Sequence, residues 1–145
     1  MYKQRIDKIK INDARGAIED LNRSIELNPK NAAAFKARGI SKLFLDDLYG
    51  AIQDFTSAIE LGSRDLTYLY YTRGYARALL GNHRAAVSDF DNLLSFDPKN
   101  DEGWAHRGHS KAELKDYKSA LSDLNEAIRI NPKNSGAYST RSVTK

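Results

Sequence analysis

Apolar residues recur along this chain at the spacing of amphipathic helices. Ile52, Phe55 and Ile59, for example, stand at positions i, i+3 and i+7, so that they share one face of a helix. The segments that begin at Val87 and Leu121 repeat this order. The pattern predicts helices rather than strands.

Each apolar stripe follows an alanine and ends in a polar sequence that often contains proline. The alanines, 34 or 35 residues apart, are Ala17, Ala51, Ala86 and Ala120. The polar sequences occupy residues 28–31, 61–64, 97–100 and 131–134. Because proline cannot continue a helix, these sequences are predicted to end the helices. The residues predicted to cap the following helices are Asn31, Asp65, Asn100 and Asn134.

The segment before each alanine is predicted to be another helix. Short breaks at residues 46–47, 81–82 and 115–116 separate it from the stripe that follows. Each period is therefore a helix–turn–helix unit, and a fixed period of this length indicates stacked units rather than a closed globule.

A glycine recurs in the middle of each first helix, at Gly39, Gly74 and Gly108. Glycine at such a position costs about 1 kcal/mol relative to alanine. That cost is reasonable if the second helix crosses so closely that a Cβ would clash. The second-helix alanines, twelve residues on, are predicted to form the matching small surface.

In register, these features resemble the tetratricopeptide-repeat family, whose pattern places an aromatic residue at position 4, glycine at 8, alanine at 20, an aromatic residue or leucine at 24 and proline at 32. The three matching sets are Phe35, Gly39, Ala51, Phe55 and Ser63; Tyr70, Gly74, Ala86, Phe90 and Pro98; and Trp104, Gly108, Ala120, Leu124 and Pro132. The departures are Ser63 at a proline position and Arg5 and Ser142 at glycine positions.

The resemblance implies an all-α fold, a right-handed superhelix of stacked antiparallel helix pairs. It divides a single array over residues 1–145 into a partial repeat (1–31), three repeats (32–66, 67–100 and 101–134) and a partial repeat or capping helix (135–145). The chain is expected to open inside a first helix.

By the same resemblance, the first helices line a concave peptide-binding groove. The candidate groove residues are Lys36, Ile40, Phe44, Tyr68, Tyr71, Tyr75, His106 and His109. Tyrosine is a common interface anchor because it combines a large rigid ring with a hydroxyl group. The alternative is that the tyrosines pack against the neighbouring repeat.

The family's clamp for the acidic tails of heat-shock chaperones is not expected here. Lys36 matches one clamp position, but Ile40, Thr72, Glu102 and His106 stand at the others.

Basic residues form a ladder along the first helices, at Arg38, Arg73, Arg107 and Arg141. A basic inner layer would favour acidic peptides. The favoured interpretation is instead that these arginines form structural ion pairs with Asp54, Asp89 and Asp123 of the second helices.

Composition narrows the chemistry. The chain has no cysteine, which excludes disulfides and thiolate metal sites. No apolar run approaches the roughly 20 residues that span a bilayer, and the start lacks a signal-like apolar segment, so a cytoplasmic protein is expected. His106 and His109 lie one turn apart without further ligands, and no nucleophile–base set or phosphate loop stands out. We therefore expect neither metal, cofactor nor enzymatic activity.

The leading hypothesis is a non-enzymatic scaffold that binds a peptide or helix of a partner protein. One alternative is a helical-repeat protein that binds RNA, although the net charge of +4 is mixed in sign. Another is a self-assembling array whose incomplete end repeats leave Ile6, Ile9, Leu124 and Ile128 poorly covered.

Overall fold

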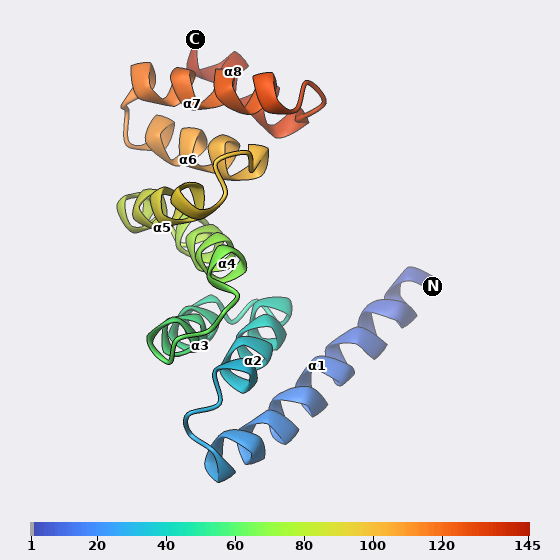
Figure 1. The fold of residues 1–145 in the computed structure, drawn as a ribbon. Coiled ribbons are helices and arrows are strands. Elements are labelled where there is room, and N and C mark those ends of the chain that lie inside the picture. The colour runs from blue at the N-terminus through green and yellow to red at the C-terminus, as the bar shows by residue number, and fades with distance from the viewer. Residues whose placement is uncertain (1) are drawn as a thin grey trace. The chain divides into compact units, whose positions relative to one another are not determined.

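A computed structural model describes the backbone of residues 2–145 and the side chains of residues 10–145. Over this range every regular element is an α-helix, which confirms the predicted all-α class (Figure 1). The helices are α1 (Tyr2–Leu27), α2 (Ala32–Phe44), α3 (Leu48–Glu60), α4 (Leu66–Leu79), α5 (His83–Phe96), α6 (Asp101–Glu113), α7 (Tyr117–Ile130) and α8 (Ser135–Thr144).

The chain forms two compact units, Met1–Asp65 and Leu66–Lys145. In the first, α2 packs against both α1 and α3. In the second, each of the helices α4 to α7 packs against the helix that follows it along the chain, and α8 also contacts α6. Within each unit, neighbouring helices therefore share their apolar faces.

Side-chain caps begin several of these helices where the sequence predicts them. The side chains of Asn31, Asn100 and Asn134 accept hydrogen bonds from backbone amides in the first turns of α2, α6 and α8. The fourth predicted cap, Asp65, directly precedes α4, and its carboxylate accepts a hydrogen bond from Lys36 Nζ at 2.8 Å.

The start of the chain differs from the expected helix pair. The first helix, α1, runs for 26 residues without a turn. In the other repeats the turn contains a residue in the left-handed region, namely Asp46, Gly81 or Lys115, whereas the equivalent Asn12 lies inside α1. A left-handed backbone is strained at Asp46 and Lys115 because these residues are not glycine. Such a turn therefore depends on the packing of the two helices that it joins.

The mid-helix glycines lie where the paired helices cross closely, as predicted. A Cβ built on Gly74 would lie 2.9 Å from Phe90 Cε1 and 3.0 Å from Asp89 Cβ. The other two glycines meet the equivalent large residue of the second helix, Phe55 or Leu124, at similarly short distances. The atoms nearest each added Cβ belong mainly to this large residue, and the Ala120 carbonyl lies 3.2 Å from the one on Gly108. The second-helix alanines are fully buried, and their role as the matching small surface stays a prediction.

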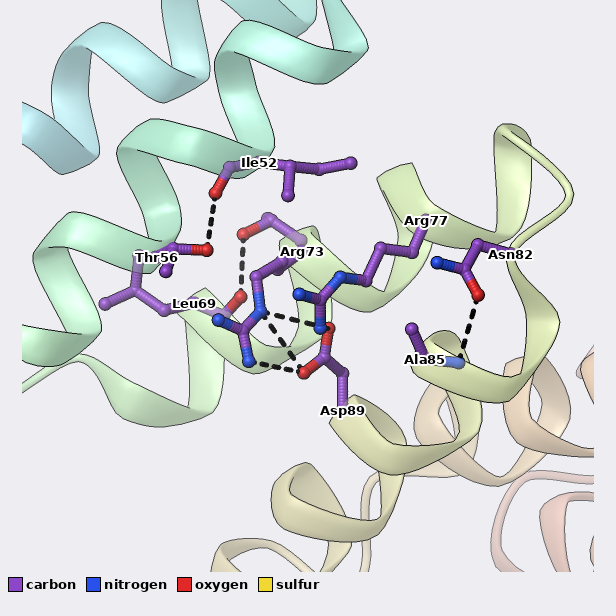
Figure 2. Close-up of polar contacts among 9 residues, drawn as sticks. Ile52, Thr56, Leu69, Arg73, Arg77, Asn82, Ala85 and Asp89 are labelled. Atoms are coloured by element: carbon purple, nitrogen blue, oxygen red, sulfur yellow. Dashed lines mark hydrogen bonds and ion pairs between the residues drawn. The ribbon is translucent and has the colours of Figure 1, made fainter.

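Each second helix carries a buried aspartate that binds two cations of the preceding helix. Figure 2 shows Asp89 between Arg73 and Arg77, with Arg73 Nη2 at 2.7 Å and Arg77 Nη1 at 2.9 Å from the carboxylate. The same arrangement joins Asp54 to Arg38 and Lys42, and Asp123 to Arg107 and Lys111. The predicted structural ion pairs are therefore confirmed.

The pKa directions of the arginines agree with these contacts. The hydrogen bond from Arg38 to Asp54 raises the pKa of Arg38. Burial lowers the pKa of Arg107, but the hydrogen bonds and charges of Asp123 and Asp91 outweigh burial and raise it overall. Both guanidinium groups therefore stay charged in the folded protein.

The predicted exposure of apolar residues near the C-terminal repeat is wrong. Leu124 is fully buried in a cluster with Ala105, Ala127 and Ala137, and Ile128 packs against that cluster. The reason is that Ala137 of α8 completes the cluster and covers these residues. The side chains of Ile6 and Ile9, which the same hypothesis named, lie outside the described residues.

We expect Gly74→Ala to destabilise the protein by about 1–3 kcal/mol, because its new Cβ must displace Phe90. The matched control is Gly16→Ala in α1, where nothing lies within 4 Å of the added atom. There the helix propensity of alanine should stabilise by about 0.5–1 kcal/mol. Urea unfolding of both variants measures the difference. A Gly74→Ala variant as stable as the parent would contradict the close crossing.

We expect Asp89→Asn to destabilise the protein by about 3 kcal/mol, because it leaves two arginines without a buried counter-charge. The matched control is Asp91, two residues away, whose side chain is 57% exposed. Within the described residues, Asp91 forms a salt bridge with Arg107 alone. Asp91→Asn should cost less than about 1 kcal/mol. Equal losses in thermal melting would show that burial of the aspartate has no special role.

Candidate functional site

A pocket of about 530 Å³ opens in the second unit. Two first helices, α4 and α6, form its sides, and the α7–α8 connection and α8 close it. The lining residues are Tyr75, Ala78, Leu79, Glu102, Ala105, His106, His109, Asn131, Lys133, Asn134, Ser135, Gly136 and Thr140.

Aromatic rings surround His106 at the centre of this site. The rings of Tyr71 and Tyr75 each meet the imidazole edge-on, with centroids 5.5 Å away, and Phe90 stacks on it at 5.8 Å. A hydrogen bond of 3.2 Å joins the Tyr71 hydroxyl to His106 Nε2. The imidazole is therefore held in one orientation, and Tyr75, with 38% of its surface exposed, presents its ring to the pocket.

The centre of the pocket is uncharged at neutral pH. Burial lowers the pKa of His106, and the nearby His109 lowers it further. Burial also raises the pKa of the Tyr71 hydroxyl, with a contribution from the charge of Glu102. Glu102 Oε2 lies 3.5 Å from His106 Nε2, so the nearest negative charge stands beside the imidazole.

The wall contributed by the α7–α8 connection is polar and internally bonded. The side-chain amides of Asn131 and Asn134 donate to Asp101 Oδ2 at 3.0 and 2.9 Å. Asn134 Oδ1 in turn accepts the Ala137 amide at the start of α8. These bonds fix the connection against α6, so the wall has a defined position.

The sequence pattern did not predict this wall, because residues 131–134 are there assigned to a helix end and to the cap of the next helix, and not to the groove. The available signal is the repeat itself: Gly136 and Thr140 of α8 occupy the second and sixth positions of a further first helix. The same two positions of α6, Glu102 and His106, also line the pocket. The register of the repeat therefore indicates that α8 contributes to the site.

The predicted site residues of the second unit lie at different depths. Tyr75, His106 and His109 line the pocket. Tyr71 lies behind it and packs against the buried cluster of Ala86, Phe90 and Leu93, so that it contributes to packing as well. Tyr68 is partly exposed and does not line the pocket.

The predicted residues of the first unit are divided between two places within that unit. Ile40 and Phe44 line a shallow depression of about 240 Å³ together with Ser41 and with residues of α1. Lys36 forms an ion pair with Asp65 at 2.8 Å. The structure thus places Ile40 and Phe44 together and Lys36 outside their depression.

The described residues bear on two kinds of ligand site, the clamp for acidic chaperone tails and a metal site. Thr72, at a clamp position, is buried, and its hydroxyl donates to the backbone carbonyls of Tyr68 and Leu69. Among residues whose side chains are described, no group of three or more histidine, cysteine, aspartate or glutamate residues is placed to hold a metal ion. Within the same part of the chain, no helix is long and apolar enough to cross a membrane.

Comparisons with known proteins agree with the repeat pattern. The model of the tetratricopeptide repeat matches residues 67–100 and 101–134. No curated protein sequence matches the chain.

Several solved structures have a similar fold. YrrB, described as a TPR protein with an unusual peptide-binding site, is 19% identical, with 92% of this chain and 69% of that chain covered and a TM-score of 0.84. The TPR domain of Arabidopsis OM64 is 25% identical, with 79% and 93% covered and a TM-score of 0.73. The first TPR of Spaghetti (RPAP3), bound to the HSP90 peptide SRMEEVD, is 18% identical, with 78% and 89% covered and a TM-score of 0.72.

We expect the stability of the second unit to fall as the pH falls through 6.5, the ordinary pKa of histidine. Because the folded protein lowers the pKa of His106, the unfolded chain takes up this proton first, and protonation favours unfolding. The loss approaches about 1.4 kcal/mol for each unit by which the folded pKa is lowered. Urea unfolding at a series of pH values, followed by fluorescence of Trp104, the single tryptophan, measures it.

The control separates His106 from the other histidines. His106→Gln should lack this component of the pH dependence, whereas His109→Gln should keep most of it, because burial is the larger cause of the lowered pKa of His106. If His106→Gln loses stability with pH as steeply as the parent, His106 is not the group responsible.

Proposed function

Since this chain belongs to the tetratricopeptide-repeat family, we propose that it is a non-enzymatic scaffold that binds a peptide or helix of a partner protein. The observation that carries the proposal is the pocket between α4 and α6, where Tyr75, His106 and His109 lie together. Its volume of about 530 Å³ falls within the usual range of ligand sites, about 300–1,000 Å³.

The lining favours a partner with an aromatic or large apolar anchor residue. Tyr75, Ala78 and Leu79 offer apolar surface along α4, and the imidazole of His106 carries no charge at neutral pH. Glu102 on one side and Lys133 on the other provide charges of opposite sign. We therefore propose that an inserted side chain supplies most of the affinity and that the surrounding charges orient the peptide.

The ion pairs disfavour both an acidic peptide and RNA as the main ligand. Arg73, Arg77, Arg107 and Lys111 all bind the buried carboxylates of the second helices. Cations held in this way are not available for phosphate or carboxylate groups of a ligand. The proposal of an acidic partner is thereby weakened, and a partner protein is favoured over nucleic acid.

The descriptions of structurally similar proteins support a peptide as the ligand, but they do not indicate one particular peptide. The printed descriptions name a peptide-binding site in YrrB and an HSP90 peptide bound to Spaghetti. Here Thr72 is buried at a clamp position and His106 is held by Tyr71 at another. We therefore propose a ligand different from the acidic chaperone tail.

The first unit offers a second candidate contact. Ile40 and Phe44 are exposed apolar residues beside α1, and we propose that they contact the same class of partner. Cytoplasmic location and the absence of enzymatic activity remain predictions within this proposal.

Peptides that bind the 145-residue chain are first selected from a displayed random library. Their affinity for the chain is then measured by calorimetry. Tyr75→Ala should weaken binding by at least 2 kcal/mol, roughly thirtyfold. Melting should change little, because Tyr75 is partly exposed. The matched control is Tyr117→Ala: Tyr117 is 49% exposed on α7 and does not line the pocket. Equal affinities of the two variants would exclude the pocket as the site.

Salt dependence separates the protein and RNA hypotheses. Peptide binding through an apolar anchor should change little between low and high salt, whereas binding of an RNA backbone would weaken steeply. A steep loss of affinity with salt, together with binding of RNA, would favour the alternative.

A further inference from the structure

We propose that the pocket between α4 and α6 binds its peptide preferentially while His106 is uncharged, so that the protein holds its partner at neutral pH and releases it in acid. The inference rests on the proposed function, because it concerns the regulation of the same site. It is carried by the position of the imidazole in the pocket, by the hydrogen bonds open to the ring and by the charges around it.

The exposed part of the His106 ring borders the pocket. The rings of Tyr71, Tyr75 and Phe90 cover the imidazole from α4 and α5, with ring centroids 5.5 to 5.8 Å away. The His106 side chain keeps 27% of its surface exposed, and it is one of those that line the cavity. A ligand that fills the pocket therefore covers the contact that the imidazole has with water. Loss of that contact disfavours the charged form of the ring far more than the neutral form.

The hydrogen bonds of the ring also favour the neutral form in a filled pocket. Protonated imidazole has two N–H donors, whereas the neutral ring has one donor and one acceptor. The Tyr71 hydroxyl meets His106 Nε2 at 3.2 Å and can accept a hydrogen bond from it. Among residues 10–145 no hydrogen bond to Nδ1 is present, so the second donor depends on water in the pocket. An apolar group that displaces this water leaves the charged ring with an unpaired donor.

Charges on α6 itself offset this loss only in part. Glu102 Oε2 lies 3.5 Å from His106 Nε2, but the Glu102 side chain is 53% exposed, so water screens the pair. His109, further along α6, opposes the proton on His106. Asp101, at the start of α6, accepts hydrogen bonds from two side-chain amides of the α7–α8 connection.

The pocket-lining residues of the other elements add no negative charge beside His106. Helix α4 contributes the phenol ring of Tyr75, and α5 places the apolar ring of Phe90 against the imidazole. The α7–α8 connection contributes Lys133, whose positive charge disfavours a protonated imidazole in the same pocket, and the lining residues of α8 are uncharged. Burial accordingly lowers the pKa of His106, and His109 lowers it further.

Occupancy of the pocket and protonation of His106 are therefore linked in a defined direction. If the peptide lowers the pKa of His106, protonation must weaken peptide binding by the same factor. Each pH unit by which the pKa falls corresponds to about tenfold in affinity between the neutral and the protonated protein. Because the pKa of His106 in the free protein lies below 6.5, affinity should be constant at neutral pH and fall in more acidic solution. A negatively charged ligand group beside the ring would give the opposite sign.

The experiment measures the affinity and the protonation of His106 with the same peptide. The peptide is selected on the 145-residue chain at pH 8 and synthesised with blocked ends and without histidine, aspartate or glutamate, so that it does not itself titrate in acid. Calorimetry gives its affinity from pH 8 to pH 5, and the imidazole resonances give the pKa of His106 in the free and the peptide-saturated chain. We expect the peptide to lower this pKa by about one pH unit and protonation to weaken binding about tenfold.

Two variants identify the histidine responsible. His106→Gln keeps a polar side chain that takes up no proton, so its affinity should not change with pH. The matched control is His83→Gln, because His83 packs against His109 but does not line the pocket. This control should follow the pH dependence of the parent. Circular dichroism at each pH checks that the helix content is kept, so that unfolding is not mistaken for release of the peptide.

Tyr75→Ala distinguishes failure of this proposal from failure of the proposed function. If no peptide can be selected, or if Tyr75→Ala binds the peptide as the parent does and the peptide leaves the pKa of His106 unchanged, both proposals fail. If Tyr75→Ala weakens binding but the peptide leaves that pKa unchanged or raises it, the pocket is the site and the coupling alone is overturned. A His106→Gln variant with the pH dependence of the parent would overturn the coupling as well.

Discussion

The buried aspartate of each second helix is the interaction on which the repeats depend. Asp54, Asp89 and Asp123 lie in the interior, where a carboxylate is stable only if it is paired and hydrogen-bonded. Each obtains that pairing from two cations one turn apart on the first helix. This fixes the register of the two helices, since a shift by one residue would separate the charges.

The same pairing determines the chemistry of the candidate groove. It uses the basic ladder for internal contacts and leaves the exposed positions of α4 and α6 to tyrosine, histidine and small residues. We therefore propose that this surface binds a partner through shape and apolar groups more than through charge. In the proposed function, the Glu102 and Lys133 side chains at the pocket orient the ligand.

The sequence predicted the features that depend on periodicity. The helices, their ends at Pro98 and Pro132 and the arginine–aspartate pairs all follow from residues that recur in register. It did not predict the continuous α1, because one missing turn depends on packing that no single position encodes. Nor did it predict the α7–α8 wall, whose position depends on the hydrogen bonds of Asn131 and Asn134 to Asp101.

The peptide-binding surface proposed on the first helices can be tested by nuclear magnetic resonance. A peptide selected on the isotope-labelled chain is added stepwise while the amide and aromatic resonances are followed. Signals of Tyr75, His106 and His109 are expected to shift together and to saturate at the same peptide concentration, while those of Tyr117 on α7 stay in place. Shifts confined to the second helices α5 and α7 would contradict the proposal.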